Sequence, residues 1–361
     1  MSRPAPAADR LDTIRRLGAA HDAEAVLVGH PDDVRWAVGF TGSNALLVVT
    51  EAEAHLVTDG RYTEQARTEV ASAEVHIADG PLVEAVRDWG LLGGAQSAVV
   101  QADRLTIAEH QRIEAAFPEA DLVPVSELLA ASVAAKSEAE VEAVRRAQAL
   151  TCEVFEAILP SIRVGMSELD LAAEITYQHL KRGASAMSFP PIVASGPRGA
   201  LPHARPTAKT LAGGELVVID MGGVLDGYCS DLTRTVAVGD PGEAARDAYA
   251  VVERAQHAAI EAAEADRLGG DLDRVARDVI EAAGLGEAFS HSLGHGVGLD
   301  VHEWPRLSQK VEHRLPAGAT VTIEPGVYLP GRFGIRIEDV IVLREGGAEN
   351  LTPLPTDLIV L

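Results

Sequence analysis

Cysteine is scarce in this sequence, which excludes a fold built on disulfides. The 361 residues contain 2 cysteines, Cys152 and Cys229, whereas small secreted domains need several cysteine pairs. Two isolated thiols are typical of a reducing compartment. The N-terminal segment also lacks the apolar run of a secretory signal peptide. We therefore expect a cytoplasmic protein whose core is held by apolar packing.

Basic residues and long apolar runs are also few. Lys and Arg total 31 against 54 Asp and Glu, which gives a formal net charge of -23. A nucleic-acid-binding surface needs clustered Lys and Arg, and an anionic membrane surface repels a chain of this charge. No stretch of the sequence approaches the roughly 18 consecutive apolar residues of a membrane-spanning helix. We expect neither a nucleic acid nor a membrane as partner.

The rest of the composition is that of a globular protein with two domains. Apolar residues make up 47% and charged residues 24% of the chain, both ordinary values for a folded protein. A chain of this length exceeds the usual size of a single core. We place the domains at 1–132 and 137–361. The connection is largely helical, with Ser137 as a helix cap and Glu140 three residues later.

The first domain has the pattern of an α/β fold, because short apolar runs alternate with helical stretches. The expected strands are 25–28, 45–49, 55–58, 75–78 and 98–100, and the expected helices are 61–70, 81–89 and 106–116.

The second domain contains an internal repeat. Three pairs of similar features are separated by nearly the same number of residues, and this spacing is too long for the repeats of a solenoid. The pairs are 213–223 with 317–327, Leu169-Asp170 with Leu272-Asp273, and His203 with His302. The repeat predicts two halves that each contribute an acid, Asp220 or Glu324, to a shared centre.

Two pairs of acids follow or interrupt apolar strand patterns. Asp220 ends LVVID, and Asp231 follows a turn-like GGVLDGY segment, so antiparallel strands would bring these carboxylates together. For either residue alone, an ordinary turn or capping role is an equal alternative. Glu324 ends VTIE. Glu338 lies in GIRIEDVIVL, where strand alternation puts it on one face with Arg336.

An inward-facing acid on an apolar strand is costly unless it is paired or bound to a metal. A salt bridge to Arg336 is the alternative to metal binding for Glu338. Three histidines, His291, His295 and His302, gather in HSLGHGVGLDVHE, where glycines allow close backbone approach.

Four carboxylates and one imidazole form a hard, oxygen-rich donor set. Such a set favours Mn²⁺ and tolerates Co²⁺, Fe²⁺ or Zn²⁺, and its four negative charges balance two divalent ions. The predicted metal ligands are Asp220, Asp231, His295, Glu324 and Glu338.

The ordered motifs IDMGG, SDLTRT, GHGVGLDVHE, IEPG and RIED resemble those of the pita-bread metallopeptidases, which include aminopeptidase P, prolidase and methionine aminopeptidase, with creatinase as a relative. The resemblance implies an α+β catalytic domain with a pseudo-two-fold duplication. It implies two metal ions per chain, one held or bridged by Asp220, Asp231 and Glu338, the other held by His295 and Glu324.

The resemblance also implies roles beyond metal binding. His203 and His302 match residues that hydrogen-bond the scissile carbonyl and the tetrahedral intermediate, and Glu324 matches the general base. Arg336 matches an arginine beside the last ligand. We assign substrate contacts to Arg336 and to two further residues, His291 and Arg306.

The N-terminal motifs PDDVRWAVGF and TDGRYTEQA resemble the creatinase-like domain of the Xaa-Pro branch. Methionine aminopeptidases generally lack such a domain, and creatinase lacks the metal ligands. The resemblance implies a homodimer or a dimer of dimers, with Trp36 and Arg61-Tyr62 as candidate contacts, although ordinary packing is the favoured interpretation of Trp36.

These inferences predict a two-metal Xaa-Pro aminopeptidase acting on peptides with proline in the second position. The alternative is an Xaa-Pro dipeptidase, or prolidase, in which Arg306 would bind the free carboxylate of a dipeptide. A non-catalytic binding protein of the same fold is a third interpretation, disfavoured by the intact ligand set.

Overall fold

The computed structural model describes residues 7–361 and divides the chain into two compact units, the first ending at Val133 and the second spanning Ala134–Leu361. The connection is helical, as predicted, with α6 at Ala130–Ala134 and α7 at Glu138–Ile158. Ser137 and Glu140 form a reciprocal capping box at the start of α7, which satisfies two otherwise unpaired donors of the helix terminus.

The first unit is an α/β domain around one mixed sheet with the strand order β4-β3-β2-β1-β5-β6. Its strands are β1 (Ala25–Val28), β2 (Ala45–Thr50), β3 (Ala54–Asp59), β4 (Glu74–Ala78), β5 (Ser97–Gln101) and β6 (Asp121–Val125). Its helices are α1 (Ala7–Ala20), α2 (Pro31–Val38), α3 (Thr63–Glu69), α4 (Leu82–Asp88) and α5 (Ile107–Ala116). All the predicted strands and helices are present, and α1, α2 and β6 are additional.

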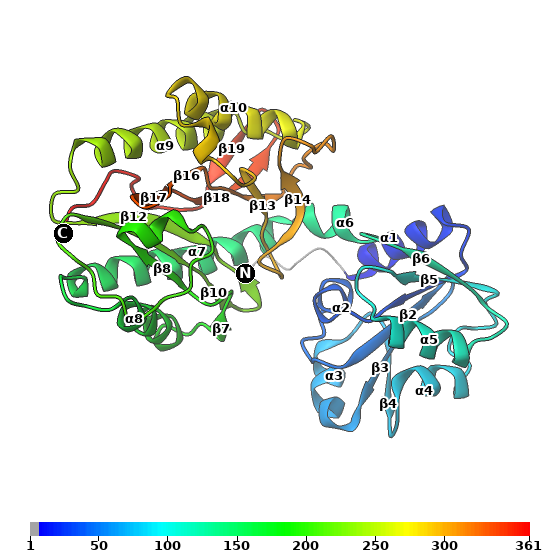
Figure 1. Ribbon diagram of the computed structural model, residues 1–361. Helices are drawn as coiled ribbons and strands as arrows, with labels where there is room; N and C mark the ends of the chain where they lie inside the picture. Colours follow the sequence, from blue (N-terminus) through cyan, green and yellow to red (C-terminus); the bar gives the residue numbers. More distant parts are fainter. Residues whose placement is uncertain (1–6) are drawn as a thin grey trace. The chain divides into compact units, whose positions relative to one another are not determined.

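The second unit repeats one arrangement, two helices followed by three strands. The first half consists of α7, α8 (Glu168–Lys181), β8 (Ile192–Ser195), β9 (Glu215–Met221) and β12 (Leu232–Val238). The second half consists of α9 (Glu243–Ala262), α10 (Gly269–Ala282), β13 (Gly294–Gly296), β15 (Thr320–Ile323) and β18 (Asp339–Arg344). In the second unit of Figure 1, strands lie between the two helix pairs.

Shorter elements complete the second unit. The strands are β7 (Ala186–Met187), β10 (Gly223–Leu225), β11 (Tyr228–Cys229), β14 (Glu303–Leu307), β16 (Gly326–Leu329), β17 (Phe333–Arg336) and β19 (Gly347–Asn350). The short 3-10 helices of the described chain are η1 (Gly60–Tyr62), η2 (Leu159–Ser161), η3 (Gly196–Ala200) and η4 (Gly286–Ala288).

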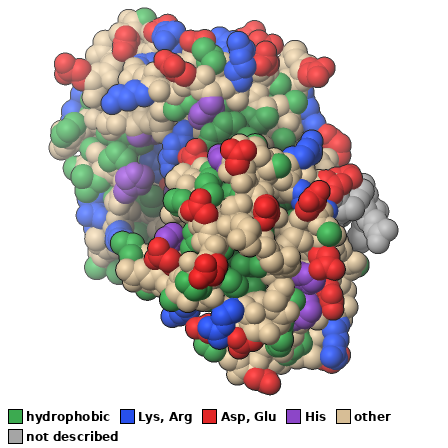
Figure 2. All heavy atoms as spheres, turned by 90° about the vertical axis from the view of Figure 1, so that its right-hand side faces the viewer, with side chains coloured by type: hydrophobic (Ala, Val, Ile, Leu, Met, Phe, Trp, Pro, Cys, Tyr) green, Lys and Arg blue, Asp and Glu red, His purple; other side chains and the backbone are tan. Residues whose placement is uncertain are grey.

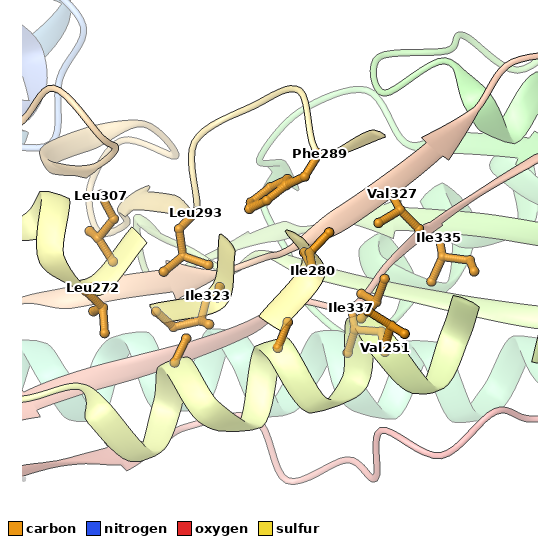
Figure 3. Packing of buried hydrophobic residues seen from close by; sticks show 14 of the residues in the cluster. Val251, Leu272, Ile280, Phe289, Leu293, Leu307, Ile323, Val327, Ile335 and Ile337 are labelled. Carbon is orange, nitrogen blue, oxygen red and sulfur yellow. The ribbon is translucent and has the colours of Figure 1, made fainter. Parts of the chain in front are cut away.

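Each half of the second unit has its own apolar core. Residues of α7 and α8 pack on β8, β9 and β12, and residues of α9 and α10 pack on β15, β17 and β18. Figure 3 shows the second core, with Val251 and Ile280 of the helices facing Ile323 and Ile335 of the strands. Two separate cores of like composition agree with the predicted duplication.

The strand register brings the four predicted acids to equivalent ends of two hairpins. Asp220 lies opposite Thr233 in the antiparallel pair β9–β12, and Asp231 immediately precedes β12. Glu324 immediately follows β15 and Glu338 immediately precedes β18, which pair in the same way. Both hairpins therefore present two carboxylates at the same end.

The continuous strand predicted over GIRIEDVIVL is wrong. β17 ends at Arg336 and pairs with β16, whereas β18 begins at Asp339 and pairs with β15. Between them, the backbone N–H of Glu338 donates to Thr233 O at 3.1 Å. The chain thus passes from one sheet to another at Glu338, and Ile335 and Ile337 still point into the apolar core.

The surface carries the acidic excess. Acidic side chains are spread over the face shown in Figure 2, and basic side chains lie between them. Within residues 7–361, no helix has both the length and the apolar character needed to cross a membrane. Both cysteines are buried.

Candidate metal centre

A cavity of about 690 Å³ in the second unit contains the predicted chemistry. All ten predicted site residues line it: His203, Asp220, Asp231, His291, His295, His302, Arg306, Glu324, Arg336 and Glu338. Further lining residues, among them a run of Pro190, Pro191 and Ile192, give one wall an apolar character. The structure therefore gathers residues from both halves of the unit around one space.

Three of the predicted ligands converge within the range of a single ion. The donor atoms of Asp231, His295 and Glu338 lie within 4.8 Å of one another, and all three residues are buried. His295 Nε2 also lies 3.4 Å from Glu324 Oε1 and 3.6 Å from Asp231 Oδ2. These separations suit donors that share a metal ion, since each would be about 2 Å from it.

The imidazole of His295 is oriented for metal binding. Its Nδ1 lies 3.0 Å from the carbonyl oxygen of Gly296, which can only accept, so Nδ1 carries the hydrogen. The lone pair of Nε2 then faces the carboxylates. Burial lowers the pKa of His295 to about 4, so the ring is neutral at physiological pH. A metal-binding histidine is commonly held by such a bond from its second nitrogen.

Asp220 provides a direct test of whether the donor set fits a cation. Its Oδ2 accepts from Arg336 Nη2 at 2.5 Å, while its Oδ1 is buried without a hydrogen-bond partner. A buried unpaired carboxylate oxygen is costly in a native protein, and a divalent cation would satisfy it. The ion pair of Arg336 is with Asp220; Glu338 accepts instead from Thr233 Oγ1 at 2.7 Å.

The carboxylates are crowded in a way that a cation would relieve. Burial, and then the charges of Glu338, Asp220 and Glu324, raise the pKa of Asp231 well above its ordinary value. Burial and the neighbouring carboxylates raise the pKa of Glu338 likewise. Burial also raises the pKa of Glu324 to about 8. Divalent charge would reverse each effect, so the residues fit a site for divalent ions.

This crowding predicts how pH changes the stability of the metal-free protein. The folded-state pKa of Glu324, about 8, lies above the ordinary 4.5, so the folded chain binds this proton more tightly than the unfolded chain. The resulting contribution to the free energy of unfolding is fully present below about pH 4.5 and is lost as pH rises through about 8. Denaturant unfolding of chelator-treated protein should therefore show a loss on the order of a few kcal/mol between about pH 5.5 and about pH 8.

Replacing the titrating carboxyl is the control for this dependence. The Glu324→Gln variant is expected to lose a large part of the decrease, because its amide does not titrate. An equal decrease in the variant and the wild type would show that other groups cause it.

The structure adds positioning residues that sequence reasoning missed. Tyr328 O–H lies 2.9 Å from His291 Nε2 and accepts from Arg336 Nη1 at 2.8 Å. Gln148 holds the backbone of Asp231 from both sides, donating to its carbonyl at 2.8 Å and accepting from its N–H at 3.1 Å. Thr233, whose hydroxyl donates to Glu338, lies in the SDLTRT motif and could have been found from it. No sequence pattern marked Gln148, which lies on α7.

Three predicted substrate residues occupy the exposed part of the cavity. His203, His302 and Arg306 are each exposed and line it. The His302 ring stands edge-to-face against the ring of His295 with centroids 4.5 Å apart.

The loop before His302 is held by a buried ion pair. Lys136 Nζ contacts Glu303 Oε2 at 2.7 Å, and Glu303 Oε1 accepts from the backbone N–H groups of Leu299 and Asp300. Both side chains of the pair are almost fully buried. A loop anchored in this way holds His302 beside the predicted ligands.

Comparisons with known proteins agree with this geometry. Residues 142–345 match the model of metallopeptidase family M24, and residues 10–132 match the creatinase/prolidase N-terminal domain. The uncharacterized peptidase YqhT of Bacillus subtilis is 37% identical over 98% of this chain and 100% of its own length. An Xaa-Pro dipeptidase of Pyrococcus furiosus is 42% identical over 62% of this chain and 64% of its own.

Solved structures resemble both units. An Xaa-Pro dipeptidase from Bacillus anthracis has a TM-score of 0.95 and 34% identity over 98% of this chain and 100% of that chain. An X-Pro aminopeptidase from Thermotoga maritima has a TM-score of 0.89 and 35% identity over 96% of this chain and 100% of that chain. The predicted fold class, an α/β domain followed by a pita-bread domain, is confirmed.

Proposed function

The chain belongs to metallopeptidase family M24, and on this premise we propose that it removes the N-terminal residue from peptides with proline in the second position. The observation that carries the proposal is the pairing of a carboxylate-rich centre with an apolar wall in one cavity. Phe189, Pro190, Pro191, Ile192 and Pro202 contribute to that wall.

We propose two divalent ions per chain, with Mn²⁺ favoured and Co²⁺ or Zn²⁺ tolerated. The donors would be Asp220, Asp231, His295, Glu324 and Glu338, since four carboxylates and one imidazole suit hard cations. Bound ions of this kind supply Lewis-acid polarisation of a carbonyl and a water of lowered pKa. The unpaired Oδ1 of Asp220 supports this donor set.

Proline imposes particular requirements on the site. An Xaa-Pro bond is a tertiary amide, so its nitrogen has no hydrogen to donate, and the ring fixes φ near about −65°. A subsite for proline therefore needs apolar side chains around the ring. Phe189, Pro191 and Ile192 are half-buried, and they offer such a surface beside the carboxylates.

The chain's own residues supply proton transfer and substrate orientation. We assign Glu324 as the base that takes a proton from the attacking water at its carboxylate and returns it to the proline nitrogen as the bond breaks. Without that proton the leaving group would be an amide anion. His302 and His203 would donate hydrogen bonds to the carbonyl oxygen as negative charge develops.

Arg336 has an electrostatic role in this assignment. Buried between Asp220 and the hydroxyl of Tyr328, its guanidinium holds one oxygen of Asp220 and leaves the other without a hydrogen-bond partner. Tyr328 in turn contacts His291. Arg336, held by Tyr328, therefore fixes the position of one proposed ligand. Arg336 and His291 line the cavity where substrate would bind.

A dipeptidase is the second candidate, and the position of Arg306 favours it. Arg306 is exposed, lines the cavity and pairs in register with His295 across β13–β14. There its guanidinium would reach the free carboxylate of an Xaa-Pro dipeptide. The cavity of about 690 Å³ is within the range for drug-sized ligands and leaves room for residues after the proline, which favours the aminopeptidase.

A series of peptides tests both the proline requirement and the length preference. We expect Xaa-Pro-Yaa to be cleaved at least roughly tenfold faster, as kcat/KM, than Xaa-Ala-Yaa, since burial of the ring contributes about 1–3 kcal/mol. Free Xaa should be released from Xaa-Pro-Yaa and longer peptides with added Mn²⁺.

The same series identifies the alternatives. Equal kcat/KM for proline and alanine, or preference for Met-Ala, would contradict the Xaa-Pro proposal. Cleavage confined to Xaa-Pro dipeptides, with a lower kcat/KM in the Arg306→Gln variant, would favour the dipeptidase. The matched control is Arg274→Gln, an exposed arginine of α10 whose side chain bonds to Asp271.

We further propose a cytoplasmic homodimer or dimer of dimers. Trp36 is buried within the first unit, which supports ordinary packing as its role. The exposed Arg61 and the half-buried Tyr62, in which the guanidinium lies 5.3 Å from the ring centroid, stay the candidates for a contact between subunits.

A further inference from the structure

A cluster of metal-binding side chains lies in the first unit, outside the cavity described above. His55 on β3 and His76 on β4 project from neighbouring parallel strands, with Glu74 on the same strand as His76. β4 is the outer strand of the described sheet, beside β3 (Figure 1). One donor atom from each of the three residues falls within 4.8 Å of the other two.

The separations between the donor atoms match those around a small cation. His76 Nε2 lies 3.2 Å from His55 Nδ1, and Glu74 places its carboxylate oxygens 3.7 Å from His55 Nδ1 and 3.9 Å from His76 Nε2. Donors bound at about 2.0–2.1 Å in tetrahedral geometry are about 3.4 Å apart. Small side-chain rotations would bring all three donors to a common ion.

A fourth residue fixes the orientation of the His55 ring. His55 Nε2 lies 3.2 Å from Glu53 Oε2, and because an ionised carboxylate can only accept, Nε2 carries the hydrogen. The lone pair of Nδ1 is then directed toward His76 and Glu74. This carboxylate–histidine arrangement is the one that commonly supports a metal-bound imidazole.

The three side chains differ in their exposure to solvent. The His55 side chain is 7% exposed and that of His76 20%, while that of Glu74 is 70% exposed. The ring of Trp89, which follows α4, lies 5.6 Å from the ring of His76. Two largely buried imidazoles and one exposed carboxylate would leave at least one position of the ion open to water.

We propose that His55, His76 and Glu74 form a second site, for one divalent transition-metal ion. Two imidazoles and one carboxylate select Zn²⁺, Ni²⁺ or Cu²⁺ and disfavour Mg²⁺ and Ca²⁺, which require oxygen donors. All the donors come from the first unit, whereas the candidate metal centre is built from the second. The bound ion would link β3 to β4 and stabilise the edge of the sheet.

Zinc binding to matched variants tests the proposal. Under equilibrium dialysis against Zn²⁺, the wild-type protein should bind one equivalent more than the His76→Gln and Glu74→Gln variants. Glu74 is mostly exposed, so its substitution leaves the fold intact. Neither residue belongs to the peptidase site, and hydrolysis of an Xaa-Pro peptide should be unchanged in both variants. Equal zinc stoichiometry in all three proteins would overturn the proposal.

Two further measurements distinguish a built site from chance binding. Substitution of the orienting residue, Glu53→Gln, should weaken binding of the extra zinc by about 10–100-fold, the usual effect of losing such a partner. Cu²⁺ should quench part of the tryptophan fluorescence, and that part of the quenching should be absent from both the His76→Gln and the Trp89→Phe variants. Unchanged affinity in Glu53→Gln, or quenching in Trp89→Phe that equals that of the wild type, would contradict the assigned geometry.

Discussion

The Asp231→Asn variant is expected to lose about one bound ion per chain and several orders of magnitude in kcat/KM for an Xaa-Pro peptide. Asp231 is 4% exposed and lies among the donor atoms of His295 and Glu338. Asparagine keeps the size of the side chain but has no charge to offer a cation. The measurements are elemental analysis and steady-state kinetics at saturating Mn²⁺.

The stability of the metal-free protein separates this loss from misfolding. Burial and neighbouring acids raise the pKa of Asp231, so its charge is unfavourable when no cation is present. Metal-free Asp231→Asn should therefore unfold at a higher denaturant concentration than metal-free wild type at neutral pH. Asp278→Asn, an exposed substitution on α10, is the matched control. Full metal content and full turnover in Asp231→Asn would refute the ligand assignment.

The His302→Ala variant is expected to keep its metal ions while kcat falls by about 10²–10³-fold, the usual effect of losing one donor to a developing oxyanion. His302 lies in the exposed part of the cavity, edge-to-face with His295 and outside the converging donor group. Its removal leaves all five proposed ligands in place. Elemental analysis and kcat for an Xaa-Pro-Yaa peptide are the measurements.

A conservative substitution distinguishes hydrogen bonding from packing at this position. Glutamine retains an N–H donor, so His302→Gln should recover part of the kcat lost in His302→Ala. The control is His21→Ala, an exposed histidine of the first unit. If metal is lost together with activity in His302→Ala, the residue binds a metal ion and the assigned role is wrong.

The sequence alone predicted the elements that obey local rules. Alternating apolar runs predicted β1 to β5, and the Ser137–Glu140 pattern predicted the start of α7, because strand alternation and helix capping depend on neighbours in the chain. β6 escaped prediction because Pro124 interrupts its short apolar run, and proline is tolerated there at the outer position of the sheet.

The sequence also suggested which acids to propose as ligands, since an acid at the end of an apolar strand is costly without a partner. The repeat of 213–223 at 317–327 further predicted that two halves share a centre, and the structure has both halves lining one cavity.

The pairing of charged groups was decided only by the tertiary structure. Sequence alternation placed Arg336 beside Glu338, yet its guanidinium reaches Asp220, 116 residues away in the chain. The cause is the passage from β17 to β18, which turns Glu338 toward Thr233. The contacts of Tyr328 and Gln148 with the site could likewise be identified only from the tertiary structure. Which side chains bond across sheets depends on where the folded backbone places them. The local periodicity of the sequence does not encode the distance between residues that are far apart in the chain.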